Sequence, residues 1–168
     1  MKHIHYTEGA ARFGMAMEKG GAFLTVKGAD GRANTMTIGW AYIGYSWGKP
    51  GLVVMVRPSR YSYPMLAHTG VFTVSVPESG TLREQLKLCG SVSGREGDKF
   101  AATGLTAMPA QSVDCPIVAE CPLHFECRVS YTQDMVPNGL NEAIDASCYG
   151  QKDYHAMFFG EIVACYER

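Results

Sequence analysis

Two arginines and two hydroxyl side chains lie within six residues of one another in the segment VRPSRYS. Arg57, Ser59, Arg60 and Ser62 follow an apolar run, 51–56, and precede a predicted helix. Guanidinium groups, hydroxyls and the free N–H groups of a helix N-terminus all donate hydrogen bonds to anions. The segment therefore predicts an anion site. The alternative is that both arginines are ordinary solvated surface charges.

A second candidate segment, NTMTI at 34–38, has the small polar and β-branched side chains typical of a strand. Backbone amides in such a run can approach a flat, hydrogen-bonding ligand closely. Gly39 then leaves space beside Trp40. The alternative is a twisted strand that is polar only because it lies at a solvent edge.

Composition limits the classes of function. A chain of 168 residues predicts a single domain, 1–168, and a formal net charge of −1 gives no general attraction for nucleic acid. Charged residues make up 18% of the chain, below the roughly 25% usual for soluble domains. The low charged fraction indicates that a partner or ligand covers part of the surface.

The N-terminal segment MKHIHYTEG lacks the apolar core of a signal peptide, and no run approaches the roughly 18 apolar residues of a membrane helix. We therefore expect a cytoplasmic protein that does not bind a membrane. In that compartment the six cysteines should be reduced. Because the sequence contains no Cys-x-x-Cys, we expect no metal site.

Hydrophobic patterning predicts a mainly β fold with short helices, arranged as a β-barrel, and disfavours a doubly wound parallel sheet. Residues 1–20 are expected to be an irregular lead-in with at most a short helical turn around 12–19, and 44–51 are expected to connect two strands that form a ligand cradle. Helices are expected from Ser62, as N-cap, to Gly70, and over 81–89. Strands are expected at 22–26, 34–38, 51–56, 71–76, 123–131, 143–149 and 156–164.

Five segments, in order, resemble the flavin reductase-like family, particularly its flavoredoxin branch: NTMTIGW, WGKP, VRPSRYS, CGSVSGREGDKF and HAMFFGEIV. The similarity extends over about residues 20–165, and the order of five short motifs is more specific than any one of them. The resemblance implies an FMN-binding split β-barrel, usually a homodimer with FMN near the subunit interface.

The resemblance also implies which residues contact the flavin. The ring edge would be lined by Asn34, Thr35, Met36, Thr37 and Ile38, and the phosphate surrounded by Arg57, Ser59, Arg60, Tyr61 and Ser62. A second loop would contribute Cys89, Gly90, Ser93, Lys99 and Phe100, and His155 would lie near the ring or its reductant as the one catalytic candidate. Three of these have ordinary alternatives: Lys99 as a surface pair with Asp98, Phe100 as core, and His155 as a structural histidine.

The activity implied is that of an oxidoreductase in which NADH or NADPH reduces FMN and the flavin reduces an acceptor. The main alternative is a flavoredoxin-type electron carrier that a partner protein reduces. An oxidase related to pyridoxamine-phosphate oxidase is a third possibility, but it would require a second phosphate cluster. The sequence shows no catalytic triad or paired-carboxylate motif, and flavin chemistry needs neither.

Overall fold

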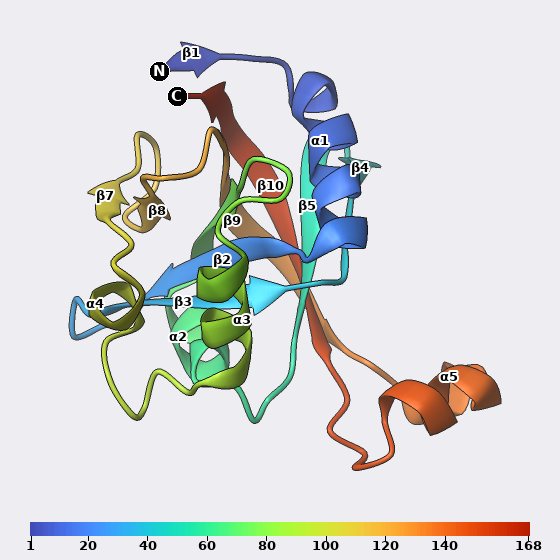
Figure 1. Cartoon of the computed structure of the whole chain (residues 1–168). Helices are drawn as coiled ribbons and strands as arrows, with labels where there is room; N and C mark the ends of the chain where they lie inside the picture. The colour runs from blue at the N-terminus through green and yellow to red at the C-terminus, as the bar shows by residue number, and fades with distance from the viewer.

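The computed structural model describes residues 1–168, and most of the chain folds around one antiparallel eight-stranded sheet (Figure 1). The strand order is β3-β2-β6-β9-β10-β5-β4, with β1 added to β10. The outermost strands of this order, β3 and β4, do not pair with each other, so the sheet curls without closing. The expected mainly β barrel is confirmed, as an open one. The strands are β1 (Lys2–His3), β2 (Ala22–Lys27), β3 (Ala33–Ile38), β4 (Ala41–Ser46), β5 (Lys49–Val56), β6 (Val71–Val76), β9 (Leu123–Asp134) and β10 (Ala156–Glu167).

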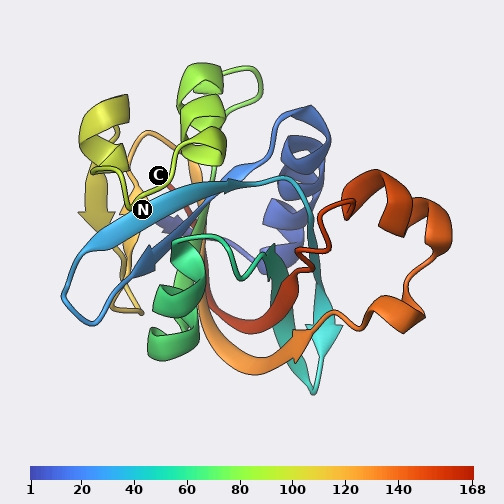
Figure 2. The same cartoon turned by 90° about the horizontal axis from the view of Figure 1, so that it is seen from below.

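Five short helices and a small hairpin surround this sheet. Figure 2 shows α2 and α3 on opposite sides of β2 and β3, whereas α5 projects away from the sheet. No helix is long and apolar enough to cross a membrane. The helices are α1 (Tyr6–Lys19), α2 (Ser62–Thr69), α3 (Arg83–Ser91), α4 (Lys99–Thr103) and α5 (Glu142–Cys148); a 3-10 turn spans Pro137–Gly139, and the hairpin comprises β7 (Ala107–Pro109) and β8 (Pro116–Val118).

The core lies inside the curled sheet, and β10 shows how the sequence builds it. Alternate side chains of β10 are buried, as expected for a strand with one face on the core. The pairing of β10 with β9 shifts between Phe159 and Gly160, which is a β-bulge. A Cβ at Gly160 would lie 2.5 Å from Cζ of Phe72, so only glycine fits here. The bulge and the glycine together bend the strand around the core.

The expectation of an irregular lead-in over 1–20 is wrong, because α1 covers residues 6–19 and is not limited to a short turn around 12–19. His5 caps the helix, and the Glu8 carboxylate accepts the His5 backbone N–H at 2.9 Å. Two helix glycines weaken the helical signal in the sequence. One of them, Gly9, is needed for packing, because a Cβ there would lie 2.9 Å from Cζ of Phe125.

The expected connection over 44–51 is also wrong. Residues 41–46 form a further strand, β4, which pairs with β5 through a tight turn at Trp47 and Gly48. Both turn residues have positive φ, 54° and 75°, as a two-residue hairpin of this hand requires. The strand of 34–38 lies at the opposite edge of the sheet from this hairpin. The two candidate cradle segments therefore approach each other across the opening of the barrel rather than as neighbouring strands.

The strand expected at 143–149 is a helix, α5. Asn141 caps it, since its side-chain oxygen accepts the Ala143 N–H at 3.0 Å. A local cap thus decides the conformation of a segment whose composition suits either structure. All six cysteines are free.

Phe13 tests how firmly α1 is docked. Its side chain is 2% exposed and meets Phe125 edge-on at 5.8 Å. Phe13→Ala should lower the free energy of unfolding by about 3–5 kcal/mol, because it removes a buried aromatic ring and leaves a cavity. Urea denaturation at a fixed protein concentration measures the change. The matched control is Met15→Ala, since Met15 is 50% exposed on the same helix. Equal midpoints for the two variants would contradict a docked α1.

Candidate functional site

Two adjoining hollows lie along the outer side of β3. The first, of about 200 Å³, is called the His155 hollow, and it is lined by Met36, Thr37, Ile38, Gly39, Trp40, Met55, Arg57, Arg60 and His155. The second, of about 170 Å³, is called the Lys99 hollow, and it is lined by Asn34, Met36, Ser59, Arg60, Tyr61, Ser62, Cys89–Glu96 and Lys99. Because Met36 and Arg60 belong to both, the hollows form one continuous groove.

The curl of the sheet brings these segments together. β3 is an edge strand, and β5 ends at Val56, where the chain turns into the 57–62 loop and α2. His155 immediately precedes β10, which pairs with β5 from Ala156 opposite Val56. The ends of β5 and β10 thus face β3 across the open side of the barrel. β3 has only one neighbouring strand, so alternate N–H and C=O groups along its outer edge have no strand partner.

The Lys99 hollow is rich in cationic groups. Arg60, Arg95 and Lys99 line it, and Glu96 is the one acidic residue among its lining residues. The Arg60 guanidinium forms no hydrogen bond or ion pair within the chain. Lys99 is 6% exposed, and its Nζ donates to the neutral carbonyl of Cys89 at 2.8 Å. Burial lowers the pKa of Lys99. A bound anion would offset this cost, because it would stabilise the ammonium form.

A close approach between β3 and the second loop shapes the same hollow. The Asn34 amide donates to the Ser62 hydroxyl at 2.8 Å, and both residues are buried. A Cβ at Gly94 would lie 2.1 Å from Oδ1 of Asn34 and 2.7 Å from Cδ1 of Tyr61. Gly94 therefore allows the 92–95 loop to lie directly on β3. The guanidinium of Arg95 then lies 5.4 Å from the centre of the Tyr61 ring.

The Arg57 side chain uses its donors within the chain, rather than leaving them free for the anion that it was predicted to bind. Its guanidinium donates to the carbonyl of Asp153 at 2.6 Å and to that of Cys148 at 2.9 Å, and it lies 4.9 Å from the centre of the Tyr149 ring. Ser59 likewise donates to the Asp153 carboxylate at 2.5 Å. These contacts fasten the segment after α5 to the start of the 57–62 loop. Arg60 is left as the unengaged arginine of the pair.

The His155 hollow has mixed character. Met36, Ile38 and Met55 give it apolar walls, and Trp40 lies with its ring 5.3 Å from that of His155. The Nδ1 atom of His155 lies 2.7 Å from the hydroxyl of Tyr149. The combination of apolar side chains with a few polar groups suits a planar, partly polar ligand.

All but two of the residues predicted from the sequence line this groove. Thr35 does not, because it is fully buried and its hydroxyl accepts a hydrogen bond from Thr25 Oγ1 at 3.1 Å. Phe100 packs in a buried cluster with Phe23 and Leu86, which is the core role considered for it. The sulfur of Cys89 is buried in that cluster too, and only its carbonyl serves the hollow, through Lys99. Asp98 caps α4 and does not pair with Lys99.

Sequence reasoning missed Gly94, Arg95 and Met55. Gly94 can be read from the segment SVSGREG, but the reason that a glycine is required there is the proximity of Asn34 and Tyr61, which are distant in sequence. In the sequence, Met55 is recognisable only as one residue of the apolar strand predicted at 51–56. No local signal identifies the side of that strand that faces the groove.

Comparison with known proteins agrees with this architecture. A family model described as the flavin reductase like domain matches residues 15–168. Flavoredoxin of Desulfovibrio vulgaris (Miyazaki F) is 28% identical with a TM-score of 0.69, over 88% of this chain and 68% of that one. Flavoredoxin from Methanosarcina acetivorans is 29% identical with a TM-score of 0.68, over 88% and 67% respectively.

A curated relative has no described function. The chain is 32% identical over 107 residues to an uncharacterised protein of Archaeoglobus fulgidus, which is 64% of this chain and 59% of that protein. The chain therefore spans less than two thirds of that relative's length. Because the family model matches almost the whole sequence, the chain belongs to the flavin reductase-like family.

Proposed function

We propose that this chain binds FMN in the groove along β3 and catalyses electron transfer from NADH or NADPH to an acceptor. The observation that carries the proposal is the continuity of the groove, in which a cation-rich hollow adjoins one with apolar and polar lining residues beside a free strand edge. Membership of the flavin reductase-like family and similarity to two flavoredoxins support the choice of flavin.

The Lys99 hollow fits the phosphate of FMN. Arg60 has donors that no group of the chain uses, and the Lys99 ammonium is buried against a neutral carbonyl. Hydroxyls of Ser62 and Ser93 line the same space. Charged donors and hydroxyls of this kind bind phosphate oxygens strongly. The donor set therefore matches a phosphate monoester, with Arg60 and Lys99 as its main charge partners.

The His155 hollow fits the ring system. The unpaired backbone groups on the outer edge of β3 can bond the polar edge of an isoalloxazine ring, while Met36 and Met55 contact its apolar surface. Trp40 is 46% exposed and stands at the mouth of the hollow, where it limits solvent access to a bound ring.

When bound, the flavin supplies the redox chemistry, since it accepts hydride from a reduced nicotinamide and passes electrons onward. The chain's own part is to hold the phosphate, to orient the ring along β3 and to restrict water. The lining residues of the His155 hollow include no carboxylate and no hydroxyl nucleophile other than Thr37, and the hydroxyl of Thr37 donates to the Leu86 carbonyl at 2.6 Å. The residues thus suit binding and positioning.

An electron carrier is the second candidate. The similarity to two flavoredoxins, at 28% and 29% identity, favours it specifically. In that case the same groove holds FMN, but a partner protein supplies the electrons. The two functions differ in whether a nicotinamide cofactor alone reduces the bound flavin rapidly.

The absorption spectrum separates these functions. Protein purified or reconstituted with FMN should show a flavin spectrum that NADH or NADPH bleaches within the time of a catalytic turnover under anaerobic conditions. A spectrum that stays oxidised with either nicotinamide, and bleaches only when a reducing partner protein is added, would establish the carrier instead. Failure to bind FMN in excess would contradict both.

Arg60 tests the position of the phosphate. Arg60→Gln should weaken FMN binding by about ten- to a hundredfold, because a hydrogen bond to a charged group is lost. Binding of riboflavin, which has no phosphate, should change little. Titration of flavin fluorescence measures both affinities. Arg83→Gln is the matched control, since Arg83 is exposed in α3 and also forms no hydrogen bond in the chain. Equal losses for FMN and riboflavin would place the phosphate elsewhere.

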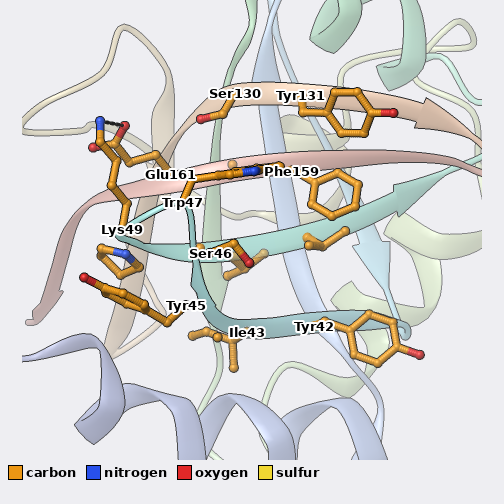
Figure 3. Close-up of a pocket in the computed structure, with 16 residues that line it drawn as sticks. Tyr42, Ile43, Tyr45, Ser46, Trp47, Lys49, Ser130, Tyr131, Phe159 and Glu161 are labelled. Atoms are coloured by element: carbon orange, nitrogen blue, oxygen red, sulfur yellow. Dashed lines mark hydrogen bonds and ion pairs between the residues drawn. The ribbon is translucent and has the colours of Figure 1, made fainter.

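A second, larger hollow supports the homodimer expected for the family. It measures about 470 Å³ and lies on the outer face of β4, β5, β10 and β9 (Figure 3). Trp47 and Tyr42 are each about two thirds exposed there, at 68% and 67%. The rings of Tyr131 and Phe159 lie 5.4 Å apart and both approach Trp47. We call Tyr42, Trp47, Tyr131 and Phe159 the aromatic face. An apolar surface of this kind on an edge hairpin marks an interaction site.

We propose that a second copy of this chain covers the aromatic face. Sedimentation velocity should show a dimer at micromolar concentration, and Trp47→Lys should shift the population to monomer, because it places a charge in the centre of the apolar contact. Met15→Lys is the control, since Met15 is an exposed apolar residue on α1. A monomeric wild-type protein with bound flavin would contradict this proposal without affecting that for the groove.

A further inference from the structure

Tyr149 lies next to the His155 hollow without lining it. It follows α5 directly and is only 2% exposed. Its hydroxyl lies 2.7 Å from Nδ1 of His155, and the two rings meet nearly perpendicularly, at 84°. This hydroxyl forms no other hydrogen bond in the chain.

The position of the Tyr149 ring is fixed by its neighbours. The ring of Tyr154 stacks on it at 5.1 Å with planes 24° apart, and the guanidinium of Arg57 lies 4.9 Å from its centre. Trp40 approaches it edge-on at 6.4 Å. Arg57 also binds the carbonyls on either side of the segment, at Cys148 and Asp153. The hydroxyl is therefore held in one place relative to His155.

The direction of the Tyr149–His155 hydrogen bond determines which ring nitrogen of His155 carries a proton. If Nδ1 were protonated, it would donate to the hydroxyl oxygen, and the hydroxyl proton of a buried tyrosine would have no acceptor. An unpaired buried donor is costly, so the hydroxyl donates and Nδ1 accepts. The proton of a neutral His155 then resides on Nε2, which forms no hydrogen bond within the chain.

The charges around His155 favour its neutral form. Burial and, to a smaller extent, the nearby guanidinium groups of Arg57 and Arg60 lower the pKa of His155 to about 4, although the Asp153 carboxylate opposes them. Burial also raises the pKa of Tyr149, so its hydroxyl keeps its proton at neutral pH. Above about pH 5 the pair therefore stays neutral, with one proton on each residue.

We propose that Tyr149 is a positioning residue that holds His155 as the Nε2–H tautomer, and so makes His155 a neutral hydrogen-bond donor to a ligand in the His155 hollow. The ligand atom it suits is an uncharged acceptor such as a carbonyl oxygen of a planar ring or amide. The identity of that ligand rests on the proposed function, but the tautomer does not, because it follows from contacts within the chain.

Long-range proton–nitrogen NMR of the full chain labelled with nitrogen-15 histidine reads the tautomer directly. At pH 7, with or without FMN, the wild-type His155 should show an unprotonated Nδ1 and a protonated Nε2. Comparison with His155→Gln assigns the signals. A wild-type spectrum with the proton on Nδ1 would overturn the proposal by itself, whether or not the protein binds flavin.

Tyr149→Phe keeps the stacked ring and removes the hydroxyl. In this variant the preference for Nε2–H should fall by up to about tenfold, and the pKa of His155 should rise, because the donor that stabilised neutral His155 is gone. Tyr154→Phe is the control, since the Tyr154 hydroxyl donates instead to Asp145 at 2.8 Å and does not touch His155. Unchanged nitrogen shifts and an unchanged pKa in Tyr149→Phe would contradict a positioning role.

Discussion

The unpaired outer edge of β3 is the constraint on which the rest of the site depends. Every buried backbone donor and acceptor needs a partner, and an edge strand leaves half of its groups without one from the sheet. Here the barrel stays open between β3 and β4, so no strand supplies those partners. The groove, the 57–62 loop and the 92–95 loop all border this edge. A flat ligand that bonds along the strand would complete the sheet edge on one side and fill the opening of the barrel on the other.

The two arginines of the 57–62 loop have different roles, one structural and one available for binding a ligand. Arg57 uses its donors on two carbonyls and stacks on Tyr149, so it stabilises the segment that follows α5. Arg60, three residues later, has no such contacts. Two arginines that look equivalent in the sequence thus serve different purposes, because both line the groove but only Arg60 has donors that the chain leaves free. The same segment positions Tyr149 against His155, which links Arg57 indirectly to the His155 hollow.

Sequence patterns predicted the strands whose side chains alternate or are continuously apolar, such as β6, β9 and β10, and they located most of the groove. They failed where a tertiary contact decides the structure. Helix α1 contains Gly9, which lowers helix propensity but lets the helix lie against Phe125. Strand β4 is largely exposed and lacks the buried face that makes a strand recognisable. The same limit applies within the site. The side chain of Thr35 points into the core. Position 94 requires a glycine because of Asn34 and Tyr61, which are distant in sequence.

The central claim is that FMN occupies the groove along β3 rather than the larger aromatic hollow, and a crystal structure of the protein grown with FMN tests it most directly. Our account predicts electron density for the phosphate beside Arg60 and Lys99, and for the ring between β3 and His155. Density for the flavin among Trp47, Tyr131 and Phe159, with the groove filled only by water, would contradict it.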